Sequence, residues 1–171
     1  MQSLREEQQE IINVDNNNSD YLSQDSEQEQ TAPLFSVQQR LQLIGSITHL
    51  MMSSQLHSKY EIVDIADRFV PALIHNQFRY YEINGNPIGF FNWAWLSDEV
   101  EEKYSTGEYV LSLDEWNSGQ NLWFPEFIAP FGHAKLIVKD LRQNIIPKGT
   151  PAKSFRMRPG DNYRLISHWK I

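Results

Sequence analysis

The sequence predicts an α+β (α/β) domain in which helices cover the faces of a mixed, largely antiparallel sheet. Three observations support this class. Two long segments have apolar residues at helical spacing, two aromatic-rich segments flank an Asn-Gly pair, and further helix-like and strand-like segments follow in mixed order. The expected order is helix, helix, strand, strand, short helix, strand, helix, strand, strand. Such a mixture is typical of helices packed on a sheet.

The charge distribution divides the chain of 171 residues into a tail and a body. Residues 1–33 contain eight acidic residues and Arg5, so they hold all of the net charge of −7. They are rich in Gln, Asn and Ser and poor in aromatic residues, which is the composition of a disordered segment. We therefore expect a disordered acidic tail over residues 1–33 and one folded domain over residues 34–171.

Several classes of site are excluded by what the sequence lacks. The absence of cysteine rules out disulfides, a thiol nucleophile and a thiolate zinc site. There is no Gly-rich phosphate loop, no serine elbow and no His/Asp/Glu spacing typical of metals, so we expect no bound metal. The aromatic residues lie in strand-like segments and indicate a core rather than a nucleic-acid surface. No segment is apolar enough for a membrane span or a signal peptide, and we expect a cytoplasmic protein.

The first two helices are predicted from apolar spacing. The segment 37–52 begins after Ser36, a plausible N-cap, and repeats apolar residues at three- and four-residue intervals. The segment 60–77 has a similar pattern. Pro71 interrupts it, and because the residue before proline disfavours helix, a break is expected near Val70.

The middle of the chain predicts a hairpin and a short helix. Two aromatic-rich strands flank Asn84-Gly85, the strongest short signal for a tight hairpin turn. The segment "SDEVEEKYSTGEY" follows, with Ser97 as N-cap and acidic residues in the first turns, where the helix dipole favours them.

The segment "LWFPEFIAPFG" (122–132) predicts a central strand with an irregularity. Pro125 cannot donate a ladder hydrogen bond, so a bulge or a splayed edge is expected there. A helix is expected over "HAKLIVKDLRQNIIP" (133–147). Two strands, "SFRMR" and "YRLISHW", around the turn "PGDN" complete the chain.

Glu126 is the least ordinary carboxylate of the chain because its neighbours are aromatic or apolar. A buried carboxylate needs a partner. An arginine, backbone donors or a histidine would each serve, and the plausible histidines are His57, His75 and His133. A histidine–carboxylate pair is a general-base arrangement. His57, in "SSQLHSKY" (53–60), is by itself equally compatible with a solvated loop, a helix-end cap or a catalytic base.

The C-terminal segment 135–171 is basic, with nine Lys or Arg and two Asp. It suits either an acidic partner, drawn in by the field of these charges, or an ordinary solvated face.

The order and spacing of five motifs resemble those of the RTX toxin-activating lysine acyltransferases, the internal protein acyltransferases that activate haemolysins. These motifs are "SSQLHSKY" (53–60), "PALIHNQF" (71–78), "PIGFFNWAWLS" (87–97), "EWNSG" (115–119) and "WFPEFIAPFG" (123–132). They cover about half of the chain.

The resemblance implies a GNAT-like fold that transfers a fatty acyl group from an acyl–acyl carrier protein to a lysine side chain. It places the catalytic histidine on His57, the catalytic carboxylate on Glu126 and the serine three residues before the histidine on Ser54. The implied partners are acyl carrier protein and a protoxin or a ribosomally made peptide. A homodimer is expected by analogy, and no cofactor is expected beyond the donor substrate.

The sequence departs from the family at two positions. The family usually has aspartate as the catalytic carboxylate, where this chain has Glu126, and an aliphatic residue before it, where this chain has Pro125. A non-catalytic module that binds a carrier protein or peptide is therefore the alternative. We also expect an apolar acyl slot that draws on the aromatic strands, with backbone N–H groups of the splayed strand at the thioester oxygen. The candidates for its lining are Phe90, Phe91, Trp93, Trp95, Trp123 and Phe124, although we expect most of these residues to belong to the core.

Overall fold

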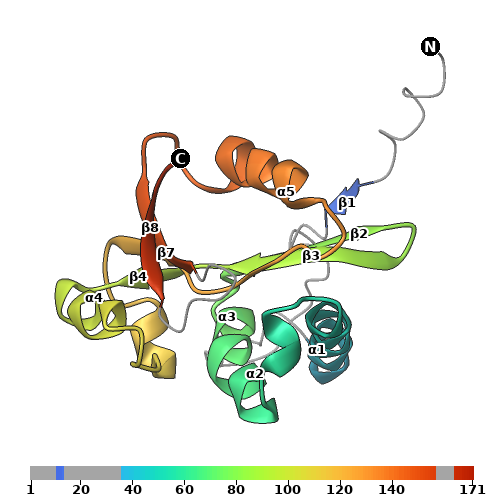
Figure 1. Cartoon of the computed structure of the whole chain (residues 1–171), viewed down its shortest axis with the longest axis horizontal. Helices are drawn as coiled ribbons and strands as arrows, with labels where there is room; N and C mark the ends of the chain where they lie inside the picture. Colours follow the sequence, from blue (N-terminus) through green and yellow to red (C-terminus); the bar gives the residue numbers. More distant parts are fainter. Residues whose placement is uncertain (1–10, 14–35, 157–163) are drawn as a thin grey trace, which may run out of the picture.

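The computed structural model describes residues 11–13, 36–156 and 164–171 (Figure 1). Most of the expected disordered tail and the expected "PGDN" turn lie outside the described residues. The helices are α1 Val37–Met52, α2 Ile62–Arg68, α3 Val70–Ile74, α4 Asp98–Ser105 and α5 Ala134–Asp140, with short helical turns at η1 His57–Lys59, η2 Leu113–Trp116 and η3 Leu141–Ile145. The strands are β1 Ile11–Asn13, β2 Phe78–Ile83, β3 Asn86–Asn92, β4 Ala94–Leu96, β5 Asn121–Phe124, β6 Phe127–Ile128, β7 Pro151–Arg156 and β8 Leu165–Lys170.

The described strands form two four-stranded sheets, in the orders β1-β2-β3-β6 and β4-β5-β7-β8. Every pair is antiparallel except β5 with β7, which is parallel. The predicted class, helices with a mixed and largely antiparallel sheet, is confirmed. The short strand β1, which pairs with the edge of β2, was not expected.

The chain passes from one sheet to the other at two neighbouring points. Trp93 separates β3 from β4, and Pro125-Glu126 separates β5 from β6. The two crossings touch, since the backbone N–H of Asn92 donates to the carbonyl of Glu126 at 3.1 Å. The splay predicted at Pro125 is confirmed, because proline has no N–H to continue the ladder. The two sheets therefore separate where Glu126 lies.

Helices cover both faces of the β2–β3 hairpin (Figure 1). Ile47 and Leu50 of α1 are completely buried against one face, and Ile137 of α5 approaches Gly89 from the other. The apolar pattern of α1 is only half buried, because Val37 and Leu41 remain exposed. No helix within the described ranges is long and apolar enough to cross a membrane.

Local sequence signals account for the ends of these elements. The Ser36 side chain accepts from the backbone of Gln39 and caps α1, and Ser97 caps α4. Asn84 and Gly85 turn the hairpin with φ of 51° and 73°, the left-handed conformations that a tight turn requires. The predicted break between the second and third helices is confirmed.

Gly119 holds the loop before β5 against the start of α4. A Cβ atom built there would lie 2.4 Å from Cα of Ser97 and 2.5 Å from the carbonyl of Leu96, both backbone atoms that cannot swing aside. We expect Gly119→Ala to lower the free energy of unfolding by about 1–3 kcal/mol, as for other overpacked sites. Gly45→Ala is the control, because nothing lies within 4 Å of a Cβ in the middle of α1. It should raise stability by about 0.5–1 kcal/mol. Urea unfolding of both variants tests this, and equal stabilities would contradict the packing at Gly119.

Candidate active site

His57 begins the 3-10 turn η1 after the end of α1. Its side chain is only 5% exposed, so the interpretation as a solvated loop residue is wrong. The turn is closed by hydrogen bonds from Ser58 N–H to the Ser54 carbonyl and from Tyr60 N–H to the His57 carbonyl. Because α1 ends at Met52, the histidine does not cap that helix either.

Glu126 lies between β5 and β6 and is 3% exposed. Its backbone N–H donates to Oδ1 of Asn92 at 2.9 Å, and Nδ2 of Asn92 donates to the carbonyl of Arg68 at 2.8 Å. The fully buried Asn92 thus ties the end of β3 to α2 and to the splayed strand. This backbone N–H is occupied by Asn92, so the thioester oxygen would need a different donor.

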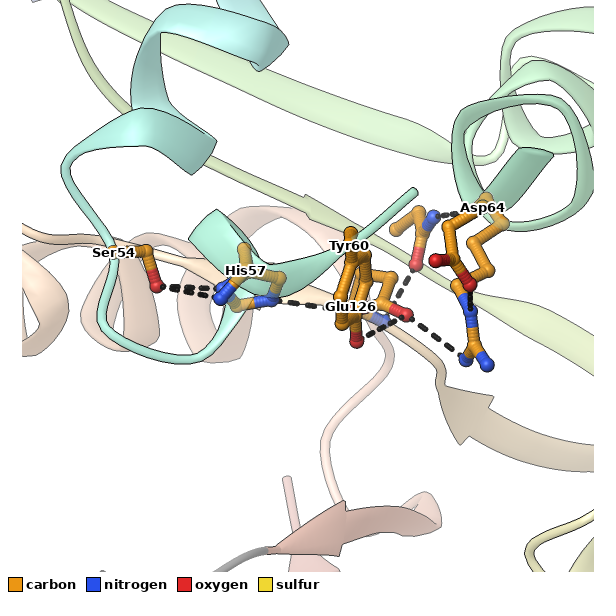
Figure 2. A network of polar contacts seen from close by, with 7 residues as sticks. Ser54, His57, Tyr60, Asp64 and Glu126 are labelled. Carbon is orange, nitrogen blue, oxygen red and sulfur yellow. Dashed lines mark hydrogen bonds and ion pairs between the residues drawn. The ribbon is translucent and has the colours of Figure 1, made fainter. Parts of the chain in front are cut away.

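Ser54, His57 and Glu126 form a hydrogen-bonded row (Figure 2). Nε2 of His57 lies 3.1 Å from Oε2 of Glu126, and Nδ1 lies 2.6 Å from Oγ of Ser54. An ionised carboxylate only accepts hydrogen bonds, so Nε2 carries the proton and the lone pair of Nδ1 faces the serine hydroxyl. The length of glutamate therefore does not prevent the pairing.

The other two histidines considered as partners of Glu126 lie elsewhere. Nε2 of His75 is 2.8 Å from the carbonyl of Leu113, and His133 precedes the first turn of α5. Of the three candidates, the structure brings only His57 to the carboxylate.

Two residues that the sequence analysis did not single out complete the surroundings of Glu126. The Tyr60 hydroxyl lies 3.3 and 3.2 Å from its two oxygens, and Nη1 of Arg68 lies 3.4 Å from Oε1. Arg68 also donates from Nε to Asp64 at 2.9 Å. An arginine partner had been considered in general terms, and the structure identifies it as Arg68.

The two side chains that contact Glu126 beside His57, those of Tyr60 and Arg68, both keep their protons. Burial and the adjacent carboxylate raise the pKa of Tyr60 far above its usual value, so Tyr60 stays a proton donor. Burial alone would lower the pKa of Arg68, but the hydrogen bond to Asp64 and the charge of Glu126 outweigh it and raise that pKa. For Asp64, burial is outweighed by the bond from Arg68, and its pKa falls. Arg68 is thus a permanent cation beside Glu126.

The Tyr60 hydroxyl is expected to hold Glu126 in place. Hydrogen bonds to charged groups contribute about 1.5–3 kcal/mol, and Tyr60→Phe should lower the free energy of unfolding toward the low end of that range. It should also slow turnover several-fold, measured as kcat at saturating donor. Tyr109→Phe is the matched control, since it removes a hydroxyl that bonds to Glu115 at 2.8 Å, outside the cavity described below. Equal effects of the two substitutions would contradict a special role for Tyr60.

A cavity of about 530 Å³ opens where the two sheets separate, with His57 and Glu126 on its wall. This volume is typical of small-ligand sites. Of the six aromatic candidates for the lining of an acyl slot, only Phe124 lines the cavity, and the expectation that most of them belong to the core is confirmed. Phe90, Phe91 and Trp123 are buried in the core, and Trp93 and Trp95 pack against it. The apolar lining comes instead from Leu56, Phe124, Phe127, Leu141, Phe155 and Trp169.

Metal binding has no support in the described part of the chain, where no three His, Asp or Glu side chains are grouped to hold an ion.

The sequence profile of the RTX toxin acyltransferase family matches residues 36–170, which include every residue of the cavity wall. The chain belongs to this family. The predicted resemblance is thereby confirmed, as is the expected kind of protein, a lysine acyltransferase of mixed α and β structure.

Individual relatives agree with this family. The chain is 41% identical to the lysine-acyltransferase RtxC of Vibrio cholerae over 105 residues, which are 61% of this chain and 69% of RtxC. It is 36% identical to the leukotoxin-activating lysine-acyltransferase LktC serotype A11 of Mannheimia haemolytica over 129 residues, 75% of this chain and 76% of LktC. It is also 43% identical to protein sll0720 of Synechocystis over 63% of this chain and 74% of that protein.

Proposed function

We propose that this acyltransferase moves a fatty acyl group from acyl–acyl carrier protein to the side-chain amine of a lysine in a protein or peptide. The observation that carries the proposal is the buried His57–Glu126 pair, with a 3.1 Å contact, on the wall of an apolar cavity. Relatives named for lysine acylation, RtxC and LktC, support the same reaction.

The reaction needs a neutral amine, and a lysine with a pKa near 10.4 is only about 0.04% neutral at pH 7. A general base is therefore required. One proton of the lysine ammonium is released to solvent. The neutral amine nitrogen then attacks the thioester carbonyl carbon, and the proton that it loses as the amide forms passes through the Ser54 hydroxyl to Nδ1 of His57. Glu126 holds the imidazole in the required tautomer and stabilises the imidazolium. When the C–S bond breaks, His57 returns the proton to the leaving thiolate, so the products are an amide and a free thiol.

The acyl chain would occupy the apolar part of the cavity. Each buried methylene contributes about 0.8 kcal/mol, so the depth of the cavity would set the preferred chain length. His57 and Glu126 would then act at the thioester end of the chain.

Three features bear on the partners. The sequence has no Gly-rich loop for a CoA pyrophosphate, and its basic C-terminal segment suits an acidic carrier protein. LktC is named for leukotoxin activation, which supports a protoxin as acceptor, with a ribosomally made peptide as the other acceptor class. Exposed Val37 and Leu41 on one face of α1 support a homodimer.

Intact-mass spectrometry tests the reaction directly. Purified protein is incubated with acyl–acyl carrier protein and a lysine-containing peptide or protoxin, with acyl-CoA as the comparison donor. A mass gain of one acyl group per acceptor from the carrier protein, and little from CoA, is expected. A protein that binds both partners but transfers nothing would be a binding module, and the proposed reaction would be wrong.

Ser54→Ala tests the proton path. Removal of the hydroxyl that contacts Nδ1 at 2.6 Å should lower kcat about 10-fold while leaving the KM for the donor unchanged, because Ser54 does not line the cavity. Ser58→Ala, which removes a hydroxyl from the same turn, is the control. An unchanged kcat in Ser54→Ala would show that the proton reaches His57 without the serine.

A further inference from the structure

The rim of the cavity carries more positive charge than the reaction uses. Its charged lining consists of Lys59, Arg68, Arg156 and Arg164 against a single carboxylate, Glu126. Arg68 is balanced by its two acidic partners. In the described part of the chain, no carboxylate lies within 4.0 Å of the charged nitrogens of Lys59, Arg156 or Arg164. These three residues, here called the rim cations, leave the cavity strongly positive.

The rim cations come from two parts of the chain. Lys59 ends the turn η1 that begins with His57. Arg156 ends β7 opposite Leu165 of β8, so Arg156 and Arg164 lie at the same end of the β7–β8 hairpin. Folding therefore brings these three cations, which are distant in sequence, to the wall of one cavity.

Two contacts hold the Arg164 side chain in place. Its Nη1 donates to the carbonyl of Gly107 at 3.1 Å, and its guanidinium lies over the Phe155 ring, 5.5 Å from the centroid. A guanidinium has five N–H donors, so one bond to a carbonyl leaves most of its fork for another acceptor. Fixed guanidinium groups bind phosphate oxygens especially well.

An apolar cavity with a cationic rim fits a ligand that is apolar at one end and anionic further along. The acceptor lysine is a cation in solution and gains nothing from these charges, whereas the donor carries an anion. In an acyl carrier protein a neutral pantetheine arm joins the thioester to a phosphodiester. We propose that Lys59, Arg156 and Arg164 bind the phosphodiester of the donor's 4′-phosphopantetheine arm. This inference rests on the proposed function and names the part of the donor that these residues recognise.

Binding of unreactive donor analogues tests the inference without requiring turnover. S-octyl-pantetheine, S-octyl-4′-phosphopantetheine and S-octyl-CoA are thioethers that cannot transfer their chain. Titration calorimetry with the full chain should give an affinity about 10-fold higher for the phosphorylated analogue than for the unphosphorylated one. The CoA analogue should bind no more tightly than the phosphopantetheine analogue.

Variants assign the effect to the rim. Arg164→Gln and Lys59→Gln should each weaken binding of S-octyl-4′-phosphopantetheine about 5- to 10-fold and leave S-octyl-pantetheine within two-fold. Arg142→Gln removes a cation of the turn that follows α5, outside this cavity, and should change neither affinity. The preference for the phosphorylated analogue should also decrease as salt is added.

Three results would overturn the inference. The first is equal affinity of the unaltered protein for the two pantetheine analogues. The second is a variant that weakens both analogues alike, which would indicate a general effect on the cavity. The third is tighter binding of the CoA analogue, which would assign the cations to a nucleotide. A preserved phosphate preference with no acyl transfer would instead overturn the proposed reaction and leave the phosphate site standing.

Discussion

Replacing His57 with alanine is expected to reduce acyl transfer by about 10²- to 10⁴-fold, the usual range for loss of a general base. Among the described residues, the other side chains in contact with the Glu126 carboxylate are a tyrosine that stays protonated and a permanent cation, Arg68, and neither can take the place of the base. Single-turnover transfer from acyl–acyl carrier protein, followed by intact mass, measures the loss.

The fold of the His57→Ala protein must be checked alongside its activity, since the histidine is buried. Glu126 retains contacts to Tyr60 and Arg68, so the variant should still unfold cooperatively. His75→Ala is the matched control, because His75 bonds to a backbone carbonyl away from the cavity. Activity in His57→Ala within a few-fold of the unaltered protein would remove His57 from the mechanism.

Glu126→Gln is expected to lower the transfer rate by about 10- to 100-fold, less than loss of the histidine. The amide keeps the size of the side chain but loses the charge that selects the Nε2–H tautomer and stabilises the imidazolium. It also leaves Arg68 without one of its two acidic partners. Initial rates at saturating donor over a pH series measure this change.

Glu126→Asp separates charge from length. The carboxylate remains but becomes shorter by one methylene, while Asn92 still fixes the backbone N–H at 2.9 Å, so the contact with His57 should lengthen. The expected order of rates is Glu, then Asp, then Gln. Glu99→Gln is the control, because the Glu99 side chain on α4 is 79% exposed, and it should leave the rate unchanged. A Gln variant as active as the parent would contradict a role for the charge.

The elements predicted from the sequence are those whose signals are local. The Ser36 cap, the Asn84-Gly85 turn and the interruption at Pro125 each act within a few residues, and the structure confirms them. The pairing of His57 with Glu126 came from a family resemblance, since nothing in spacing alone selects one histidine among three.

The features that were missed depend on contacts distant in sequence. Tyr60 and Arg68 reach Glu126 across 66 and 58 residues, and no periodic pattern reports such contacts. One signal was available: a carboxylate among aromatic residues needs several donors, and Arg68 is an isolated cation in a largely apolar stretch. Most of the six aromatic residues named as candidates for the cavity lining are core residues, as expected, and only Phe124 faces the cavity. The other lining residues were missed, because strand alternation does not tell which face of a split sheet encloses space.

The interruption at Pro125-Glu126 has a consequence for how this enzyme can change. The His57–Glu126 pair is held by η1, α2 and the end of β3. Much of the cavity wall belongs instead to β5, β7 and β8 of the other sheet, through Phe124, Phe155 and Trp169. The residues proposed for proton transfer and the residues that shape the cavity thus belong to different parts of the chain. Under the proposed function, substitutions at Phe155 or Trp169 would change which acyl chain is accepted and leave the His57–Glu126 pair unchanged. Related enzymes could then differ in their acyl group while they keep the same proton-transfer residues.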